Sequence, residues 1–194
     1  MKNEEKATLI FIIDESGSMN CVTSDTIGTY NSLLAEHKNT GKNIFVTLVL
    51  FNSEVKKIYS HIPIDKVAEL TTESYCPCST TALCDAVCET LEDELFHQLA
   101  ASEEDKPDKT LVFIVTDGLE NASRKYYSDD VGKMITATKK MGWQYAFYGA
   151  NFDVEKIGKS YSLAMEDLTP FEQTREGMIR FKRSSSAKLM DFLN

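Results

Sequence analysis

The sequence predicts an α/β fold: a Rossmann-like, doubly wound, mostly parallel sheet with helices on both faces. Two apolar runs, 10–13 and 111–115, are typical of strands that are buried on both faces. Segments with apolar residues at helical spacing alternate with such runs, as expected for crossovers in a parallel sheet. An aspartate follows each run: Asp14 comes directly after the first, and Asp117 comes one residue after the second. Ligands of open parallel sheets bind beyond the carboxyl ends of the strands, so this edge is the expected site.

The turn after the first run has the pattern Asp14-x-Ser16-x-Ser18. Gly17 lets the backbone curl between the serines, so that three hard oxygens can approach one point, as in a magnesium or calcium ligand set. Asp, Ser and Gly are also ordinary turn residues. This pattern alone therefore does not decide between a metal site and a turn.

The next segments predict a helix and a hairpin. Residues 25–38 carry apolar side chains at helical spacing, and Gly41 follows as a stop signal. Residues 43–51 form a second apolar run, and the short 52–53 connection leads to 54–62, whose lysines suit an exposed antiparallel edge strand. Pro63 ends that strand.

Residues 71–80 contain Pro77 and show no periodicity, which predicts a surface loop. A helix follows, with an apolar stripe at every fourth position: Leu83, Val87, Leu91, Leu95 and Leu99. Its acidic residues are expected to form a solvated surface: Glu89, Glu92, Asp93 and Glu94.

After the strand that ends at Asp117, Ser128 is the expected cap of a helix that reaches Lys140, with Gly142 after it. A strand at 143–150 and a short helix ending near Gly158 come next.

The C-terminal part is expected to add a strand near 164–168 and a helix. Thr169-Pro170-Phe171-Glu172 has the pattern of a capping box with proline at the first helical position. Gly177 and the serines at 184–186 are candidate breaks in this helix. Its expected inward residues are Phe171, Met178, Phe181, Leu189 and Phe192. We therefore expect a single domain over 1–194, with a core at about 7–160 and a C-terminal helical segment at about 169–193.

Three motifs together resemble the metal-ion-dependent adhesion site (MIDAS) of the von Willebrand factor type A (VWA) domain. They are Asp-x-Ser-x-Ser after the first strand, Thr81-x-Leu-x-x-Ala at a helix start, and Thr-Asp-Gly after a later strand. The resemblance covers about 7–150. One departure is that the family often has glycines where Ser79 and Thr80 stand. The resemblance implies this set of metal ligands: Asp14, Ser16, Ser18, Thr81 and Asp117.

Hydroxyl and carboxylate oxygens suit a hard divalent cation, with Mg2+ as first choice and Mn2+ or Ca2+ as alternatives. An ion held mainly by neutral oxygens still attracts an anion. In the family that anion is a Glu or Asp carboxylate of a protein partner, so the resemblance implies a metal-dependent protein-binding module. The alternative is that these residues bind no metal and act only as turn and cap residues at a sheet edge.

The net charge of -9 disfavours nucleic acid and anionic membranes as partners. Residues 1–6 carry acids where a secretory signal would be basic, and the following apolar run is too short for a membrane span. We therefore expect a cytoplasmic protein with reduced cysteines.

Four thiols cluster in the sequence, at Cys76, Cys78, Cys84 and Cys88. Their spacing is unusual for zinc, and small apolar roles serve Cys84 and Cys88 equally well. The histidines His37, His61 and His97 show no shared spacing, which favours ordinary surface or half-buried positions.

An enzyme would need a base or nucleophile beside the metal. The sequence has neither a phosphate-binding Gly-x4-Gly-Lys-Ser/Thr loop nor a Gly-x-Ser-x-Gly elbow. Glu15 follows the metal aspartate but is expected to point away from it. We therefore predict a non-enzymatic binding module, with a metal-assisted hydrolase as the alternative.

Overall fold

A six-stranded sheet lies at the centre of the molecule, with strand order β3-β2-β1-β4-β5-β6. The computed structural model describes residues 5–38 and 40–194, so the first four residues of the predicted acidic N-terminus lie outside the described part. The strands are β1 Lys6–Asp14, β2 Asn43–Phe51, β3 Val55–Pro63, β4 Lys109–Thr116, β5 Gln144–Gly149 and β6 Leu168–Pro170. Among the described strands only β3 pairs antiparallel to its neighbour, β2, and the other pairs are parallel. The predicted fold class, with one antiparallel edge strand, is confirmed.

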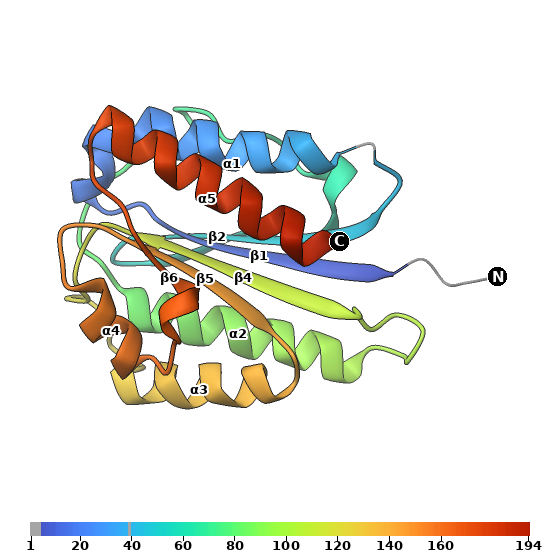
Figure 1. Cartoon of the computed structure of the whole chain (residues 1–194). Coiled ribbons are helices and arrows are strands. Elements are labelled where there is room, and N and C mark those ends of the chain that lie inside the picture. The colour runs from blue at the N-terminus through green and yellow to red at the C-terminus, as the bar shows by residue number, and fades with distance from the viewer. Residues whose placement is uncertain (1–4, 39) are drawn as a thin grey trace.

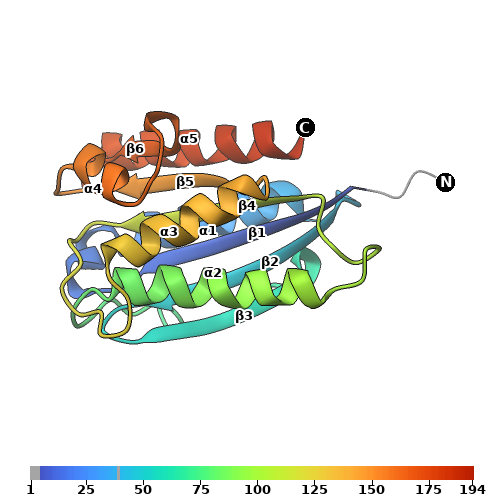
Figure 2. The same cartoon turned by 90° about the horizontal axis from the view of Figure 1, so that it is seen from below.

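Helices cover both faces of the sheet (Figures 1 and 2). They are α1 Thr23–His37, α2 Leu83–Ala100, α3 Ser128–Lys140, α4 Val154–Ser160 and α5 Arg175–Leu193. In Figure 1, α1 and α5 lie above the sheet, and α2, α3 and α4 lie below it. No helix in the described part of the chain is both long and apolar enough to span a membrane.

Strand β1 separates two hydrophobic cores. Leu9, Phe11 and Ile13 pack into the core under α1 and α5, whereas Ile10 and Ile12 pack into the core under α2 and α3. Successive side chains of a strand point to opposite faces, so an unbroken apolar run fills both layers. Burial of each aliphatic side chain contributes roughly 1.5–3 kcal/mol to the free energy of folding, so a strand with apolar residues on both faces is most stable inside the sheet, where β1 lies.

The predicted faces of α2 need two corrections. Leu99 is 64% exposed, whereas Glu94 is 3% exposed and belongs to the interior. At about 100° per residue, a step of four advances around the helix by about 40°, so an every-fourth stripe drifts away from the core over four steps. The same drift turns Glu94, one residue before Leu95, toward the sheet.

The helix starts in the second half also differ from the predictions. α3 begins with Ser128 itself, and the carboxylate of Asp130 accepts the Tyr127 amide at 3.0 Å. Residues Met165–Asp167 form a 3-10 turn, so the strand lies at Leu168–Pro170 and begins at the last residue of the predicted range.

The predicted capping box at 169–172 is wrong. Thr169 pairs with Tyr148 and Pro170 with Gly149 in the sheet, so the first half of this segment belongs to β6 and not to a helix. α5 is capped instead by Thr174, whose hydroxyl accepts the Gly177 amide at 3.1 Å. The pairing with β5 outweighs the local helix signal, because each hydrogen bond in the sheet satisfies backbone groups that would otherwise lack a partner.

The final helix runs unbroken from Arg175 to Leu193, through both predicted break points. A methyl group on Gly177 would lie 2.2 Å from the Glu172 carbonyl oxygen, so close packing explains the glycine. The predicted inward residues are all buried: Phe171, Met178, Phe181, Leu189 and Phe192.

Candidate metal centre

The turn after β1 folds its polar side chains back on themselves. The Ser16 amide donates to Asp14 Oδ1 at 2.7 Å, and the hydroxyls of Ser16 and Ser18 lie 3.0 Å apart. From Gly17 the chain enters a 3-10 helix that leads directly into α1, so the helical path begins earlier than predicted. These contacts hold three side-chain oxygens at the carboxyl end of the central strand, on the left in Figure 1.

Hydrogen bonds join this turn to the end of β4. Ser18 Oγ donates to Asp117 Oδ1 at 2.6 Å, and Thr116 Oγ1 donates to Asp14 Oδ2 at 2.6 Å. The parallel pairing of β1 with β4 brings both aspartates to the same edge of the sheet.

Thr81 enters from the segment before α2. Its amide donates to Asn121 Oδ1 at 2.9 Å. A methyl group built on Gly118 would lie 3.2 Å from Thr81 Oγ1 and 3.5 Å from Ser18 Oγ, so both hydroxyls flank this glycine. The structure therefore brings all five predicted site residues together at one edge.

The first turn of α2 is capped from another segment. Glu120 Oε2 accepts the Cys84 amide at 2.8 Å, and Ser123 Oγ accepts the Asp85 amide at 3.0 Å. The N-cap residue Ala82 makes no side-chain cap bond. Because Glu120 and Ser123 satisfy these amides, the Thr81 hydroxyl is not needed as a helix cap.

The loop before Thr81 has a backbone conformation typical of glycine, although serine stands at that position. Ser79 has φ of +68°, in the left-handed region that favours glycine. Its carbonyl accepts the Gly17 amide at 3.1 Å, and its hydroxyl donates to Ser53 Oγ at 2.8 Å. These bonds hold a strained serine where the family often has glycine.

Two carboxylates are buried at the site without a cationic side chain. Asp14 is fully buried and Asp117 is 2% exposed, and neither forms an ion pair with a described residue. Burial raises the pKa of Asp14 to about 6, against hydrogen bonds from Thr116 and Ser16 that lower it. Burial likewise raises the pKa of Asp117. Paired buried acids of this kind are stabilised by a bound cation. The oxygens of the five residues fit a hard divalent ion.

Several residues that shape the site were missed from the sequence. Thr116 and Asn121 hold Asp14 and Thr81, and the Tyr75 hydroxyl donates to the Asp14 carbonyl oxygen at 2.6 Å. Gln173, from the turn before α5, donates its amide to Asp117 Oδ2. Thr116 is the threonine of the Thr-Asp-Gly motif, so its place beside Asp117 is visible in the sequence. The residues around Gln173 carry no signal that it reaches the site.

Glu15 points away from the site, as predicted. Its carboxylate accepts Lys56 Nζ at 2.7 Å and the Cys76 amide at 2.8 Å, and its carbonyl accepts the Cys78 amide at 2.9 Å. Glu15 thus fixes the loop that leads to Thr81.

The cysteines do not form one four-thiol group. Cys84 and Cys88 are buried in the core under α2, whereas Cys76 and Cys78 are exposed on the loop. Burial raises the pKa of Cys84 to about 11 and that of Cys88 to about 12, which disfavours the thiolate that zinc requires.

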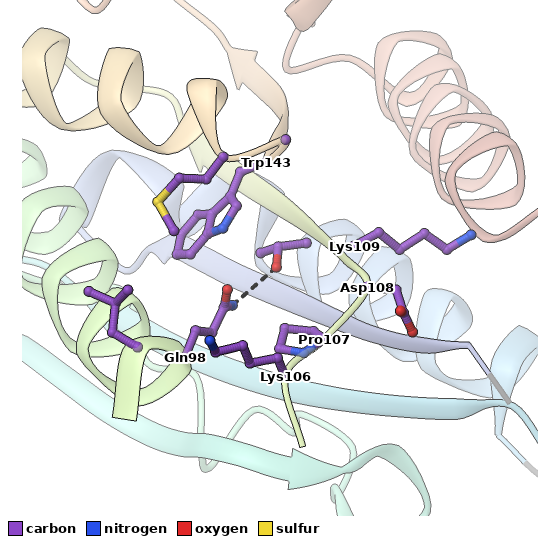
Figure 3. Close-up of a pocket in the computed structure, with 10 residues that line it drawn as sticks. Gln98, Lys106, Pro107, Asp108, Lys109 and Trp143 are labelled. Atoms are coloured by element: carbon purple, nitrogen blue, oxygen red, sulfur yellow. Dashed lines mark hydrogen bonds between the residues drawn. The ribbon is translucent and has the colours of Figure 1, made fainter. Parts of the chain in front are cut away.

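A separate pocket of about 170 Å³ lies at the other end of β4 (Figure 3). It is lined by Gln98, Lys106, Trp143 and neighbouring residues, and Gln98 Nε2 donates to Thr110 Oγ1 at 3.1 Å. Thr110 pairs with Thr8 near the start of β1, so this pocket is remote from Asp14.

Comparison with solved structures reveals close likeness in fold. Manganese-loaded TRAP of Plasmodium vivax aligns with a TM-score of 0.68 and 15% identity, over 97% of this chain and 74% of that chain. Proximal thread matrix protein 1 from the mussel byssus, with a zinc-occupied MIDAS motif, aligns with a TM-score of 0.63 and 14% identity, over 96% of this chain and 46% of that chain. This chain thus spans about half the length of the mussel protein.

A von Willebrand factor type A structure from Catenulispora acidiphila aligns with a TM-score of 0.60 and 14% identity, over 96% of this chain and 43% of that chain. No protein-family model matches the sequence. No curated protein matches it either. The strand order, the helices on both faces and these alignments agree: the chain has the fold of a von Willebrand factor type A domain.

Proposed function

We propose that this protein is a metal-dependent protein-binding module with a MIDAS-like site. A divalent cation, Mg2+ first and Mn2+ or Ca2+ as alternatives, is held by the five clustered residues, and an acidic side chain of a protein partner completes its coordination. The observation that carries this proposal is the convergence of three hydroxyls and two buried carboxylates at the carboxyl edge of the sheet, where no basic side chain of the described residues pairs with the carboxylates.

The chemistry supports an open coordination position. Mg2+ favours six oxygen ligands at about 2.0–2.1 Å and readily keeps waters. Hydroxyls contribute no charge, so an ion bound here keeps part of its attraction for anions. A chain with a net charge of -9 repels acidic partners in general. A bound cation would attract a partner carboxylate that can reach its open coordination position.

The comparisons support a divalent ion in this fold. One similar structure is manganese-loaded, and another has a zinc-occupied MIDAS motif. Others include a pilus adhesin and a pilus tip protein, which fits an interaction role. A protein partner, a single domain over 1–194 and a cytoplasmic location are parts of the proposal.

The second candidate is a metal-assisted hydrolase that uses the same site. Glu15, the carboxylate next in sequence to Asp14, is engaged by Lys56 and by the Cys76 amide. This arrangement favours a structural role for Glu15 over that of a general base, and so favours the binding module.

Water-proton relaxation of bound Mn2+ tests the proposal directly. The relaxation enhancement reports waters on the ion, and acetate serves as a minimal carboxylate probe. We expect Mn2+ to bind the parent chain, Mg2+ to compete, and acetate to displace a bound water. Thr81→Ala should weaken Mn2+ binding, and Thr80→Ala, next to it on the exposed loop, is the matched control.

Two outcomes would contradict the proposal. Equal Mn2+ affinity of the parent and of the Asp14→Asn variant would show that the site is assigned wrongly. Metal-dependent hydrolysis of p-nitrophenyl phosphate that disappears in Asp14→Asn would favour the hydrolase.

A further inference from the structure

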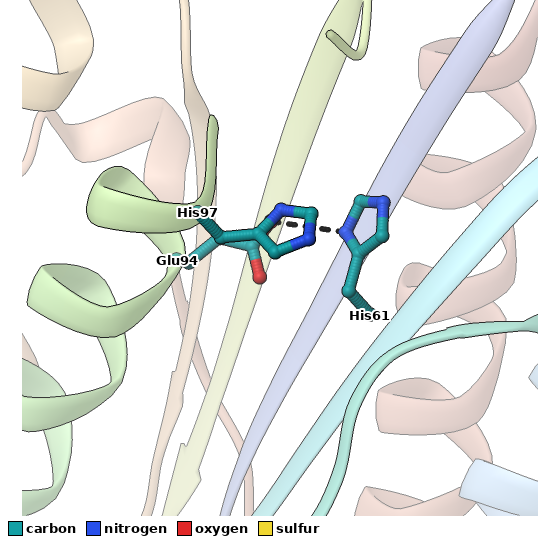
Figure 4. A group of neighbouring side chains, drawn as sticks. All are labelled: His61, Glu94 and His97. Atoms are coloured by element: carbon teal, nitrogen blue, oxygen red, sulfur yellow. Dashed lines mark ion pairs between the residues drawn. The ribbon is translucent and has the colours of Figure 1, made fainter. Parts of the chain in front are cut away.

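Two histidines and a glutamate that are scattered in the sequence meet between β3 and α2 (Figure 4). One ligating atom from each of His61, Glu94 and His97 lies within 4.8 Å of the others. His61 is half-buried and His97 is exposed, as predicted, but the two lie side by side although their spacing does not show it. His37 is buried on α1, so the predicted surface or half-buried position is wrong for that residue. Glu94 and His97 are three positions apart on α2 and share one helix face.

The Glu94 carboxylate is buried and held in place by neutral donors. Thr47 Oγ1 donates to Oε2 at 3.0 Å, and Gln98 Nε2 donates to Oε1 at 3.1 Å. Gln98 also contacts Thr110, as Figure 3 shows, which fixes its amide. The carboxylate is thus oriented by a second layer of hydrogen bonds, as metal-binding carboxylates usually are.

No lysine or arginine of the described residues pairs with Glu94. His61 lies close enough for an ion pair, which forms only when its imidazole is protonated. Burial raises the pKa of Glu94, but its contacts with His61, Gln98 and Thr47 outweigh burial and hold that pKa below the usual value. The carboxylate is therefore an anion in the interior, where an anion requires a nearby positive charge.

His61 is aimed at Glu94 by a strained backbone. Its φ of +51° is uncommon for a residue other than glycine. It lies at a bulge in β3, opposite Thr47, whose hydroxyl accepts the His61 amide at 3.0 Å. Bulges re-aim side chains and often occur beside functional sites.

The ring of His61 is packed but lacks a well-formed hydrogen bond. It stacks on Phe45 with centroids 4.4 Å apart. Nδ1 lies 3.4 Å from Glu94 Oε1, yet this buried nitrogen has no hydrogen-bond partner in the described part of the chain. An oriented and unsatisfied imidazole nitrogen beside a carboxylate is a ready metal ligand.

His97 supplies the third donor, from an exposed position. Its ring centroid lies 4.1 Å from that of His61. Both rings border an open pocket of about 610 Å³, through which an ion and water have access. In a tetrahedral zinc site with bonds of about 2.0–2.1 Å, ligand atoms are roughly 3.3 Å apart. Rotation of the exposed His97 ring is the main adjustment required.

We propose that His61, Glu94 and His97 bind Zn2+, with solvent from the pocket in the fourth position. Two imidazoles and one carboxylate suit zinc and disfavour Mg2+. The ion would neutralise the charge of the Glu94 carboxylate and would also give the His61 Nδ1 atom a partner. This site is independent of the MIDAS-like one: Phe45 pairs with Thr8, six residues before Asp14 on β1, or about 20 Å along the strand.

Zinc titration by calorimetry and by histidine NMR tests the proposal. The measurements use the full chain with Cys21, Cys76 and Cys78 changed to serine, because exposed thiols also bind zinc. Excess Mg2+ occupies the other candidate site. The chain has 3 histidines, so each imidazole gives one resolvable signal.

We expect one zinc per chain and shifted signals for His61 and His97, with the His37 signal unchanged. His97→Gln should lower zinc affinity at least tenfold, and because His97 is exposed, this variant should keep its fold. Glu94→Gln should also lower zinc affinity, because the amide keeps the size of the side chain and one acceptor oxygen but loses the charge and the second acceptor oxygen. Lys57→Gln, beside the same pocket, is the matched control and should bind zinc like the parent.

Two results would overturn the proposal. One is zinc affinity in His97→Gln equal to that of the parent. The other is a titration in which the His61 and His97 signals stay fixed, which would leave a plain ion pair between His61 and Glu94.

Discussion

The side-chain amide of Gln173 donates a hydrogen bond to Asp117, 56 residues earlier in the chain. Gln173 lies in the turn between β6 and α5, so the C-terminal segment reaches the proposed metal edge. The amide binds Oδ2 while Ser18 binds Oδ1, and both bonds lower the pKa of Asp117 against the larger effect of burial. Gln173 thus shares this carboxylate with any cation that binds there.

Gln173→Ala should therefore tighten Mn2+ binding. Loss of a competing hydrogen bond worth about 1 kcal/mol corresponds to roughly fivefold in affinity. Calorimetric titration measures the change, with the exposed Gln144→Ala as a control that should match the parent. Weaker binding in Gln173→Ala would instead show that the amide positions Asp117 for the ion.

Gly118→Ala should impair metal binding without unfolding the chain. The added methyl group would lie 3.2 Å from Thr81 Oγ1 and would push the hydroxyl aside by a few tenths of an ångström. We expect at least a tenfold loss of Mn2+ affinity by calorimetry, with little change in the melting temperature of the metal-free protein.

The matched glycine control for this prediction is Gly28→Ala in α1, where an added methyl meets nothing within 4 Å. This change should stabilise the helix by about 0.5–1 kcal/mol and leave Mn2+ affinity unchanged. Unchanged affinity in Gly118→Ala would argue against Thr81 as a ligand.

Two adjacent lysines should differ sharply in their effect on stability. Lys56 pairs with Glu15, whose side chain is 3% exposed, whereas Lys57 pairs with Asp93, whose side chain is 56% exposed. Lys56→Met leaves a buried carboxylate unpaired and should cost about 3 kcal/mol of unfolding free energy. Lys57→Met should cost less than about 1 kcal/mol. Urea unfolding of both variants checks this, and equal losses would contradict it.

The stability of the metal-free protein should depend on pH through Asp14. Its pKa is raised from 3.8 to about 6 in the folded state, chiefly by burial. The stabilisation from this group is therefore fully present below pH 3.8 and is lost as the pH rises through about 6. At pH 7 the charged carboxylate costs at most about 3 kcal/mol of unfolding free energy.

Asp14→Asn removes that charge, so in EDTA the variant should be more stable than the parent at pH 7 and similar to it at pH 4. Urea unfolding at the two pH values measures the difference. A difference that does not change with pH would contradict the raised pKa of Asp14.

The sequence determined the fold class and the gathering of the MIDAS-like residues because both depend on local patterns. An apolar run such as that of β1 can only be buried on both faces, and parallel strands end at a common edge. Asp14 and Asp117 follow two such runs, so strand direction places both at the same end of the sheet, and the pairing of β1 with β4 makes them neighbours. Whether a metal and a partner bind there stays a prediction.

Tertiary structure alone decided which distant side chains complete each site. Helix drift buries Glu94, a bulge turns His61 toward it, and pairing with β5 makes a strand of a segment with a helix-start pattern. Gln173 reaches Asp117 for the same reason, since β6 anchors the turn before α5 beside the proposed metal site. Such contacts depend on long-range packing and pairing energies, which outweigh local preferences and leave no mark in the neighbouring residues.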